Sequence, residues 1–562
     1  MWYLTDIPRY KAEKDSIRAL ASQEGQIHPV NWRMSDRGRL ILDVDIVVGN
    51  RTFEAFLQYP AQYPELPPSI YPRDEKSRWS NHQYGTGGEL CLEYRPDNWT
   101  TDLTGADMLA SAYRLLSTEN PTEGPVVVAR SAHEESLGQS LRIDYLRFVH
   151  TRRLDDFLAS VAVGQMLQAN ILVHYRSECA VYLVDKVTKA GGEIWKNPDI
   201  PDGLGSETYE RTISVMRVAE DAPLPPTTGA PEFHVAAEAL GFGADEKSMI
   251  ILRGGGVHCF LLNDKTVFKF SPIPAETEMP RVDKSHAVLR GKSVTLVGCG
   301  SLGSKIATSL ARAGVADFFL VDDDVLLPDN MVRNDLDWRD VGVHKARALA
   351  NRIKNVNPAA QVHVRCFRFA GQEASESAET ALASLLRRDL VIDATANPSV
   401  FNLLSSVVEK KKKPMVWGEV FGGGFGGLIA RYRPGIEPPP VLMRRAIENW
   451  FGERDYRPER TGRDYATGGD GPSMIADDAD VASIAAATTR LAIDVLIGRN
   501  PSYFPSSVYA IGLAPEPGLF TQAFETFPLE MPPSPIPALA AELTPEEIKV
   551  EAEEIIKLIS AT

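Results

Sequence analysis

Residues 293–303, Ser-Val-Thr-Leu-Val-Gly-Cys-Gly-Ser-Leu-Gly, decide the fold of the C-terminal half of this chain. A short apolar strand at 294–297 runs directly into the pattern G-x-G-x-x-G, and a helical pattern follows. Glycines here allow a tight turn and let backbone N–H groups approach phosphate oxygens at the helix N-terminus. The stretch predicts a nucleotide-binding loop of Gly298, Gly300 and Gly303, which dinucleotide-dependent dehydrogenases would also show.

Outward from this loop, strand and helix patterns alternate. Apolar strands are expected at 294–297, 318–321 and 390–392, with helical patterns between them. Such alternation is typical of a parallel, doubly wound α/β sheet of the Rossmann type.

Polar residues at set spacings follow the second strand: Asp322, Asp324, Asn330, Arg333 and Lys345. An acid at the end of this strand has the spacing of a ribose-binding residue. Two cations beside a glycine loop suit ATP better than NAD, because adenylation develops charge on the α-phosphate and on pyrophosphate. The sequence therefore predicts an ATP site with all five side chains.

The same segment resembles a known family over residues 285–500. The ubiquitin-activating (E1) and ThiF/MoeB adenylating enzymes share a glycine loop, D-x-D, N-x-x-R, a lysine, N-P and D-x-T-D-N, in that order. The last two pieces stand here as Asn357-Pro358 and Asp393-Ala-Thr-Ala-Asn397. The resemblance implies an enzyme that uses ATP and Mg²⁺ to adenylate the C-terminal carboxylate of another polypeptide.

The resemblance also implies roles for single residues. Asp322 is expected to hold the ribose, and Arg333 and Lys345 are expected to hold the phosphates. The second acid of D-x-T-D-N, which helps to bind magnesium in the family, is Ala396 here. Asp393, or a neighbouring acid, is therefore the candidate for Mg²⁺.

A second resemblance, over residues 55–121, is to the catalytic core of ubiquitin-conjugating (E2) enzymes. Its pieces are Y-P-x-x-P-P at 63–68, His82, G-x-x-C-L at 88–92 and Trp99. Cys91 falls at the thioester cysteine, and a thiol suits this role as both nucleophile and leaving group. The family's H-P-N is altered, so Gln83 is a candidate oxyanion donor. His82 is either a general base or a structural residue.

The sequence leaves open three routes by which the acyl group could reach Cys91. E1 enzymes that form thioesters usually carry a cysteine after the nucleotide site, but no cysteine follows Cys366. The expected transfer segment is a Gly-rich polar stretch at 463–473. A hydroxyl there, best Thr467 and then Ser473, could form an oxyester. Alternatively, Ala466 replaces a transfer cysteine, or the adenylate passes directly to Cys91.

These pieces predict four parts: an E2-like α+β domain at 1–155, a strand-rich connector at 156–275, a ThiF/E1-like adenylation domain at 276–540 and a helical tail at 541–562. Together they resemble bacterial fused E2–E1 proteins, including those of CBASS and related antiphage operons. That resemblance implies activation of a ubiquitin-like protein and its transfer through Cys91 to a target protein. The alternatives are a sulfur-carrier adenylating enzyme whose N-terminal domain only docks a partner, or a non-enzymatic scaffold.

The composition of the chain disfavours several classes of binding partner and of site. The net charge of −15 disfavours nucleic acid as a partner, and no apolar run approaches the ~18 residues of a membrane span. The five cysteines are scattered, so neither a disulfide framework nor a zinc site is expected. We expect a cytoplasmic protein. By the ThiF resemblance it is a homodimer through the adenylation domain, with Arg281 or Arg290 reaching across the interface.

Overall fold

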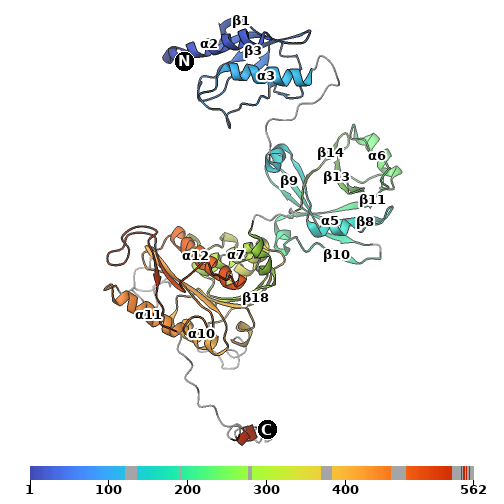
Figure 1. The fold of residues 1–562 in the computed structure, drawn as a ribbon. Coiled ribbons are helices and arrows are strands. Elements are labelled where there is room, and N and C mark those ends of the chain that lie inside the picture. Colours follow the sequence, from blue (N-terminus) through green and yellow to red (C-terminus); the bar gives the residue numbers. More distant parts are fainter. Residues whose placement is uncertain are drawn as a thin grey trace. The chain divides into compact units, whose positions relative to one another are not determined.

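The computed structural model describes residues 1–85, 87–120, 136–189, 191–275, 282–368, 382–456 and 476–533, with six single residues beyond them (Figure 1). Two compact units are present, Met1–Ile143 and Asp144–Thr562. The helical tail predicted at 541–562 lies almost wholly outside the described residues, and only single helical positions such as Glu546 and Val550 are seen.

The first unit is an antiparallel meander covered by helices. Its main elements are α1 (Trp2–Thr5), α2 (Ile7–Glu24), β1 (Ile27–Met34), β2 (Leu40–Val48), β3 (Arg51–Gln58), β4 (Ser69–Pro72), β5 (Gln83–Tyr84), β6 (Glu89–Leu90) and α3 (Gly105–Glu119), followed by the short α4 (Leu137–Ser140) and η1 (Leu141–Ile143). The sheet order is β1-β2-β3-β4, and β5 and β6 form a separate hairpin. Leu42, Val44 and Ile46 are fully buried with residues of α2 and α3, so both helices pack on the core face of the meander.

The boundary predicted at 155 falls too late, because the first unit ends at Ile143. The second unit begins with the strand β7 (Leu146–Val149), followed by α5 (Arg152–Ala159). β7 pairs in parallel with β9 (Ala180–Thr188) and β15 (Ser271–Ile273). Residues 146–149 therefore form a strand because they pair with strands that are distant in the sequence. The local sequence pattern does not contain this information.

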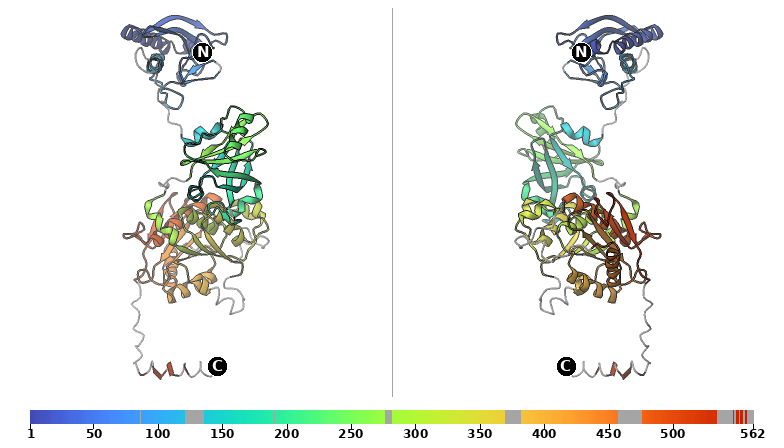
Figure 2. Two further views of the ribbon diagram at one scale, coloured as in Figure 1. Left: turned by 90° about the vertical axis from the view of Figure 1, so that its right-hand side faces the viewer. Right: turned by 90° about the vertical axis from the view of Figure 1, so that its left-hand side faces the viewer.

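The connector is strand-rich, as expected, and forms its own mixed sheet (Figures 1 and 2). Its further elements are β8 (Met166–Tyr175), β10 (Ile194–Lys196), η2 (Asp202–Glu207), β11 (Tyr209–Arg217), α6 (Ala230–Ala239), β12 (Ser248–Arg253), β13 (Gly256–Leu262) and β14 (Val267–Lys269). Among the described residues the strand order is β14-β13-β12-β11-β8-β9-β7-β15, with β10 on β9.

The C-terminal domain is the doubly wound sheet that the glycine stretch predicts. Its elements are η3 (Lys284–Gly291), β16 (Ser293–Val297), α7 (Ser301–Ala313), β17 (Asp317–Val321), η4 (Pro328–Val332), η5 (Trp338–Asp340), α8 (Lys345–Val356), β18 (Gln361–Arg365), β19 (Leu390–Asp393), α10 (Pro398–Lys410), β20 (Met415–Val420), β21 (Gly426–Tyr432), α11 (Pro440–Gly452), α12 (Asp478–Ile497), β22 (Val508–Gly512) and β23 (Thr526–Leu529). The order is β18-β17-β16-β19-β20-β21-β22-β23. Strands β18 to β20 are parallel, and β21 to β23 extend the sheet in antiparallel fashion.

Two cores cover the two faces of this sheet. On one face, α7, α8 and α12 pack against alternate strand residues such as Leu296 and Leu320. On the other face, α10 and α11 pack against the intervening residues, such as Val297 and Val321. Because both faces are buried, the strands β16, β17, β19 and β20 are apolar at most positions, whereas the edge strand β18 alternates between exposed and half-buried residues.

None of the helices in the described ranges combines the length and the apolar composition needed to cross a membrane. All five cysteines are free thiols; Cys179, Cys259 and Cys299 are buried, while Cys91 and Cys366 are partly exposed. Burial raises the pKa of Cys259 and of Cys299, so neither thiol is primed for chemistry. Exposure thus leaves Cys91 and Cys366 as the accessible cysteines.

Candidate functional site

The glycine loop joins β16 to α7 in a turn that needs glycine at two positions. Gly298 has a φ of +92°, which side-chain-bearing residues rarely adopt. A Cβ on Gly303 would lie 1.9 Å from the carbonyl oxygen of Gly298, so the loop closes onto the helix only without one. The loop therefore brings the N-terminus of α7, with its unpaired backbone N–H groups, to the carboxyl edge of the sheet.

A cavity of about 520 Å³ lies at this edge. Residues from the ends of β16, β17 and β20 line it, together with the turns after β19 and β17. The predicted residues that line it are Gly298, Gly300, Asp322, Asp324, Asn330, Arg333 and Lys345. The fold thus brings the scattered motif residues to one cavity, while Gly303 supports the loop beneath it.

Asp322 is fixed by the backbone around it. One carboxylate oxygen accepts from the Cys299 N–H at 2.6 Å, and the other accepts from the Asp324 N–H at 2.9 Å. Burial raises the pKa of Asp322, although these hydrogen bonds favour its charged form. A carboxylate has about four acceptor positions, so it can still accept from the hydroxyl groups of a sugar.

Lys345 begins α8 and is held at the cavity by the loop after β17. Its Nζ lies 2.8 Å from an Asp324 carboxylate oxygen, and its backbone N–H donates to the Asp324 carbonyl at 2.8 Å. The lysine side chain is only 11% exposed. A positive charge is therefore placed at the cavity with few conformations to lose on binding an anion.

The candidate magnesium residue is placed differently from expectation. Asp393 is buried under the next turn, where one of its oxygens accepts from the Thr395 N–H at 3.0 Å and the Thr395 hydroxyl at 2.7 Å. Burial raises the pKa of Asp393 to about 6. Asp393 lines a small neighbouring cavity of about 30 Å³, which Glu419 also lines. Of these two acids, only Glu419 also lines the larger cavity.

Glu419 is thus a residue that sequence reasoning missed. β19 and β20 are parallel, with Asp393 opposite Trp417, so Asp393 and Glu419 project from the same face of the sheet. The sequence did contain an indication of this position, because Glu419 lies near the end of the apolar run 415–420. Acids at the carboxyl ends of parallel strands converge on one edge.

Asn334 was also missed. Its side chain is buried, with Nδ2 3.5 Å from the Cys299 carbonyl oxygen and Oδ1 accepting from the Leu336 N–H at 3.2 Å. It ties the segment that carries Arg333 to the glycine loop. Nothing in its spacing distinguished it from other polar residues of that segment.

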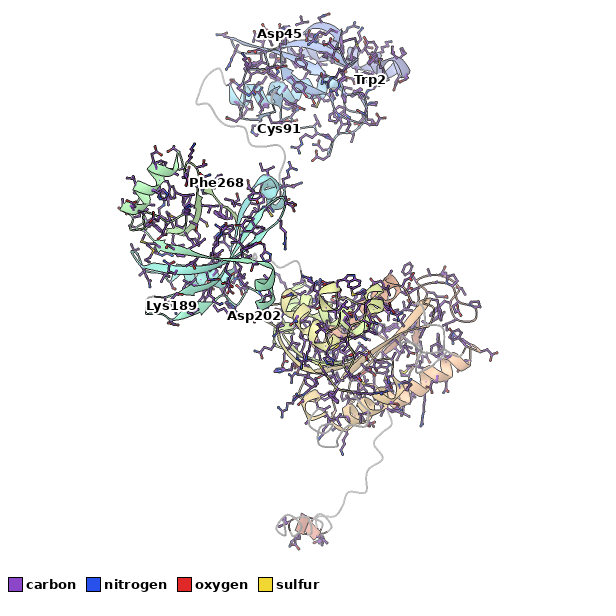
Figure 3. All side chains as sticks on the ribbon, turned by 180° about the vertical axis from the view of Figure 1, so that it is seen from behind. Trp2, Asp45, Cys91, Lys189, Asp202 and Phe268 are labelled. Carbon is purple, nitrogen blue, oxygen red and sulfur yellow. The ribbon has the colours of Figure 1, made fainter. Side chains whose placement is uncertain are left out.

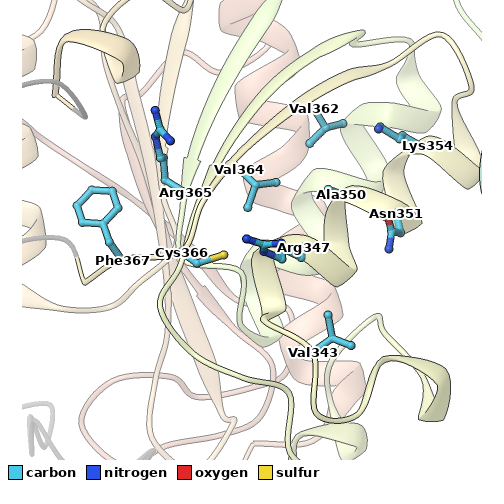
Figure 4. Close-up of a pocket in the computed structure, with 10 residues that line it drawn as sticks. All are labelled: Val343, Arg347, Ala350, Asn351, Lys354, Val362, Val364, Arg365, Cys366 and Phe367. Carbon is cyan, nitrogen blue, oxygen red and sulfur yellow. The ribbon is translucent and has the colours of Figure 1, made fainter. Parts of the chain in front are cut away.

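A second cavity, of about 630 Å³, lies between α8 and the end of β18 (Figure 4). Arg347 and Lys354 of α8 line it, together with Val364, Arg365 and Cys366. Cys366 follows Arg365, the last residue of β18, and is partly exposed. This larger cavity has no glycine loop and no acid, so the smaller one is the nucleotide-site candidate.

Cys91, which is labelled in Figure 3, lies beside the β5–β6 hairpin of the first unit. Gln83 pairs with Leu90 and Tyr84 with Glu89, and the Cys91 N–H donates to the His82 carbonyl at 2.7 Å. The same unit joins two other pieces of the E2-like pattern, because the Trp99 indole N–H donates to the Pro64 carbonyl at 2.7 Å.

The amide of Gln83 does not face the thiol as we expected. Its Oε1 accepts from the Trp79 N–H at 2.6 Å and the Ser80 N–H at 3.3 Å, while its Nε2 donates to the Gly88 carbonyl at 2.7 Å. Leu90, its partner across the hairpin, is buried. The side chain therefore braces the loop from inside, and this correction leaves the oxyanion donor unassigned.

His82 is held by a buried acid. Its Nε2 lies 3.8 Å from a Glu119 carboxylate oxygen, and the other oxygen accepts from the Asn81 N–H at 2.9 Å. The Glu119 side chain is 3% exposed. This arrangement favours the structural role for His82 over that of a general base.

Several predicted residues lie outside the described ranges: Thr467, Ala466 and Ser473 of the transfer segment, and Arg281. Arg290 lies in the last turn of η3, three residues before β16 begins, and is exposed. The homodimer through the adenylation domain stays a prediction.

Comparisons with known proteins identify a family domain in the C-terminal half of the chain. The ThiF family matches residues 279–438. The uncharacterized protein y4qC of Sinorhizobium fredii is 26% identical over 488 residues, which cover 79% of this chain and 82% of that protein. Among solved structures, E. coli MccB with ATP shares 16% identity over 45% of this chain and 67% of its own, with a TM-score of 0.34. That last similarity is too low to support any assignment.

Two further relatives match shorter segments. The ATP-dependent ubiquitin transferase-like protein Cap2 of Enterobacter hormaechei is 36% identical over 125 residues, or 22% of this chain and 20% of that protein. The probable adenylyltransferase/sulfurtransferase MoeZ of Mycobacterium tuberculosis is 30% identical over 134 residues, or 24% of this chain and 32% of its own length. With its ThiF family domain at 279–438 and its similarity to bacterial Cap2 proteins, the chain is a ThiF/E1-like enzyme.

Proposed function

We propose that this enzyme adenylates the C-terminal carboxylate of a ubiquitin-like protein and transfers the acyl group to Cys91 for conjugation to a target protein. The observation that carries the proposal is the single cavity lined by the glycine loop, Asp322, Arg333 and Lys345. The ThiF match and the similarity to Cap2, named as ubiquitin transferase-like, support it. We further propose a role in antiphage defence, on the resemblance of the chain to the fused E2–E1 proteins of antiphage operons.

The chemistry needs two displacements. In the first, a carboxylate oxygen attacks the α-phosphorus of ATP, and pyrophosphate leaves. In the second, a sulfur or oxygen nucleophile attacks the acyl carbon, and AMP leaves. Both leaving groups are anions, and the cations and helix N-terminus around the cavity stabilise such charge.

The function is tested by pyrophosphate exchange with a small protein that has a free C-terminal carboxylate. We expect incorporation of labelled pyrophosphate into ATP only in the presence of the acceptor, because the exchange reverses acyl-adenylate formation. The same acceptor with a C-terminal amide is the control and is expected to give no exchange. Exchange that is equal with the carboxylate and the amide would contradict the proposal.

We further propose that Mg²⁺ accompanies the ATP. No three His, Cys, Asp or Glu side chains are grouped as a metal site in the described ranges. Mg²⁺ at nucleotide sites commonly takes one or two carboxylates, with phosphates and water as the other ligands. The donor chemistry at the cavity fits this pattern. Glu419 is the carboxylate we assign to the ion, and the ion would neutralise phosphate charge when bound.

Replacing Glu419 by glutamine is expected to weaken magnesium-dependent nucleotide binding, because a neutral amide is a poorer ligand for a hard cation. Calorimetric titration gives the factor by which Mg²⁺ increases the affinity for ATP. We expect this factor to be at least about tenfold smaller in the variant than in the parent. Asp393→Asn is the matched comparison and is expected to have the smaller effect. An unchanged magnesium dependence in Glu419→Gln would remove Glu419 from the site.

A second function is favoured by the similarity to MoeZ, named an adenylyltransferase/sulfurtransferase. In it, the adenylated partner would be a sulfur carrier, and the first unit would only dock a protein. The two functions separate at Cys91, because sulfur-carrier activation does not use that thiol.

The route to Cys91 also stays a prediction. An oxyester on Thr467, a replaced cysteine at Ala466 and direct transfer are the candidates, and the bond each would form differs in its chemical lability.

A further inference from the structure

The face of the β5–β6 hairpin that carries Cys91 contains a second group able to take part in acyl transfer. Side chains of paired strands alternate between the two faces of a hairpin. Gln83 and Leu90 pair on one face, with Leu90 buried and the Gln83 amide bonded to the backbone. Tyr84 and Glu89 pair on the opposite face.

Cys91 belongs to the face of Tyr84. Its backbone N–H donates to the His82 carbonyl, so Cys91 lies opposite His82, one step beyond the Gln83–Leu90 pair. Tyr84 is then the diagonal neighbour of Cys91, at a separation that an aromatic side chain can span. Tyr84 is 52% exposed and Cys91 is partly exposed.

We propose that the phenol of Tyr84 is the oxyanion donor for acyl transfer at Cys91, in the role for which the sequence suggested Gln83. This rests on the proposed function of Cys91. In the step, an amine nitrogen attacks the thioester carbonyl carbon, and negative charge develops on the carbonyl oxygen. The C–S bond then breaks, Cys91 leaves as thiolate, an amide forms and the amine's proton passes to water. Tyr84 keeps its proton and donates a hydrogen bond throughout.

The charge state of the phenol supports this role. Burial raises the pKa of Tyr84, and the negative charges of Glu89 and Cys91, together with a side-chain hydrogen bond to Glu89, raise it further. The hydroxyl therefore remains protonated at neutral pH, as a donor must be. The closeness of the two side chains follows from the register of the hairpin, which puts both residues on one face.

The test separates loading from discharge. Full-length protein with Cys366→Ala, which removes the other accessible thiol, is loaded at Cys91 by thiol exchange with the C-terminal thioester of a Gly-Gly peptide. Free lysine is then added, and loss of the thioester is followed by mass spectrometry. We expect Tyr84→Phe to load normally and to discharge to lysine at least about tenfold more slowly, the scale of losing one oxyanion donor. Tyr113→Phe on α3 is the matched control and should behave as the parent.

A second variant distinguishes chemistry from packing. Tyr84→Gln supplies an amide donor and should recover part of the rate that Tyr84→Phe loses. Discharge of Tyr84→Phe within twofold of the parent, or equal slowing in the Phe and Gln variants, would overturn the role of Tyr84. Failure of parental Cys91 to accept any acyl group would instead refute the proposed function itself.

Discussion

Replacing Arg333 by alanine is expected to slow acceptor-dependent pyrophosphate exchange about 100- to 1000-fold, or roughly 3–4 kcal/mol in activation free energy. The guanidinium lies at the end of η4 and lines the cavity with Asp322 and Lys345. It stabilises charge that develops on the phosphates only during transfer, so its loss should lower the exchange rate more than ATP affinity.

The matched control is Arg347→Ala. Arg347 lies on α8 and is exposed, and it lines the second cavity rather than this one (Figure 4). Its removal deletes the same charge from the same domain and should leave exchange within about twofold, as for a surface substitution. Equal loss in the two variants would show a general charge effect, and unchanged exchange in Arg333→Ala would remove Arg333 from the site.

Replacing Cys91 by alanine is expected to abolish the adduct with the carrier protein that thiol reductants cleave. A thioester exchanges readily with added thiol, whereas an oxyester does not. The adduct is followed on gels with and without reductant, and pyrophosphate exchange should continue at the parental rate because the nucleotide cavity is intact. Cys366→Ala, which removes the other partly exposed thiol, is the control and should keep the adduct.

The residual adduct in Cys91→Ala reports the transfer route. If Thr467 carries the acyl group, this variant should retain an adduct that resists reductant but yields to hydroxylamine, and adding Thr467→Ala should remove it. Direct transfer instead predicts no adduct in Cys91→Ala and normal charging of Cys91 in Thr467→Ala. A reductant-labile adduct that persists in Cys91→Ala would contradict the assignment of Cys91, and pyrophosphate exchange without any adduct at Cys91 in the parent would favour the sulfur-carrier function.

Much of the adenylation domain could be predicted because its constraints are local. The strand at 294–297 is buried on both faces and mostly apolar, and Gly298 and Gly303 occupy positions where a side chain would strain or clash. The cations and acids follow strand ends, and parallel topology brings those ends together. Many of the residues that line this cavity can therefore be predicted from the sequence.

What the sequence by itself determined is the order of its domains, the glycine loop with its charged partners, and the candidacy of Cys91. Tertiary structure alone decided which carboxylate faces the nucleotide cavity, because Asp393 and Glu419 are brought together only by the pairing of β19 with β20. It also decided that Gln83 points inward while Tyr84 shares a face with the thiol. One residue along a hairpin reverses the direction of a side chain, and only the register of the paired strand sets which face is buried.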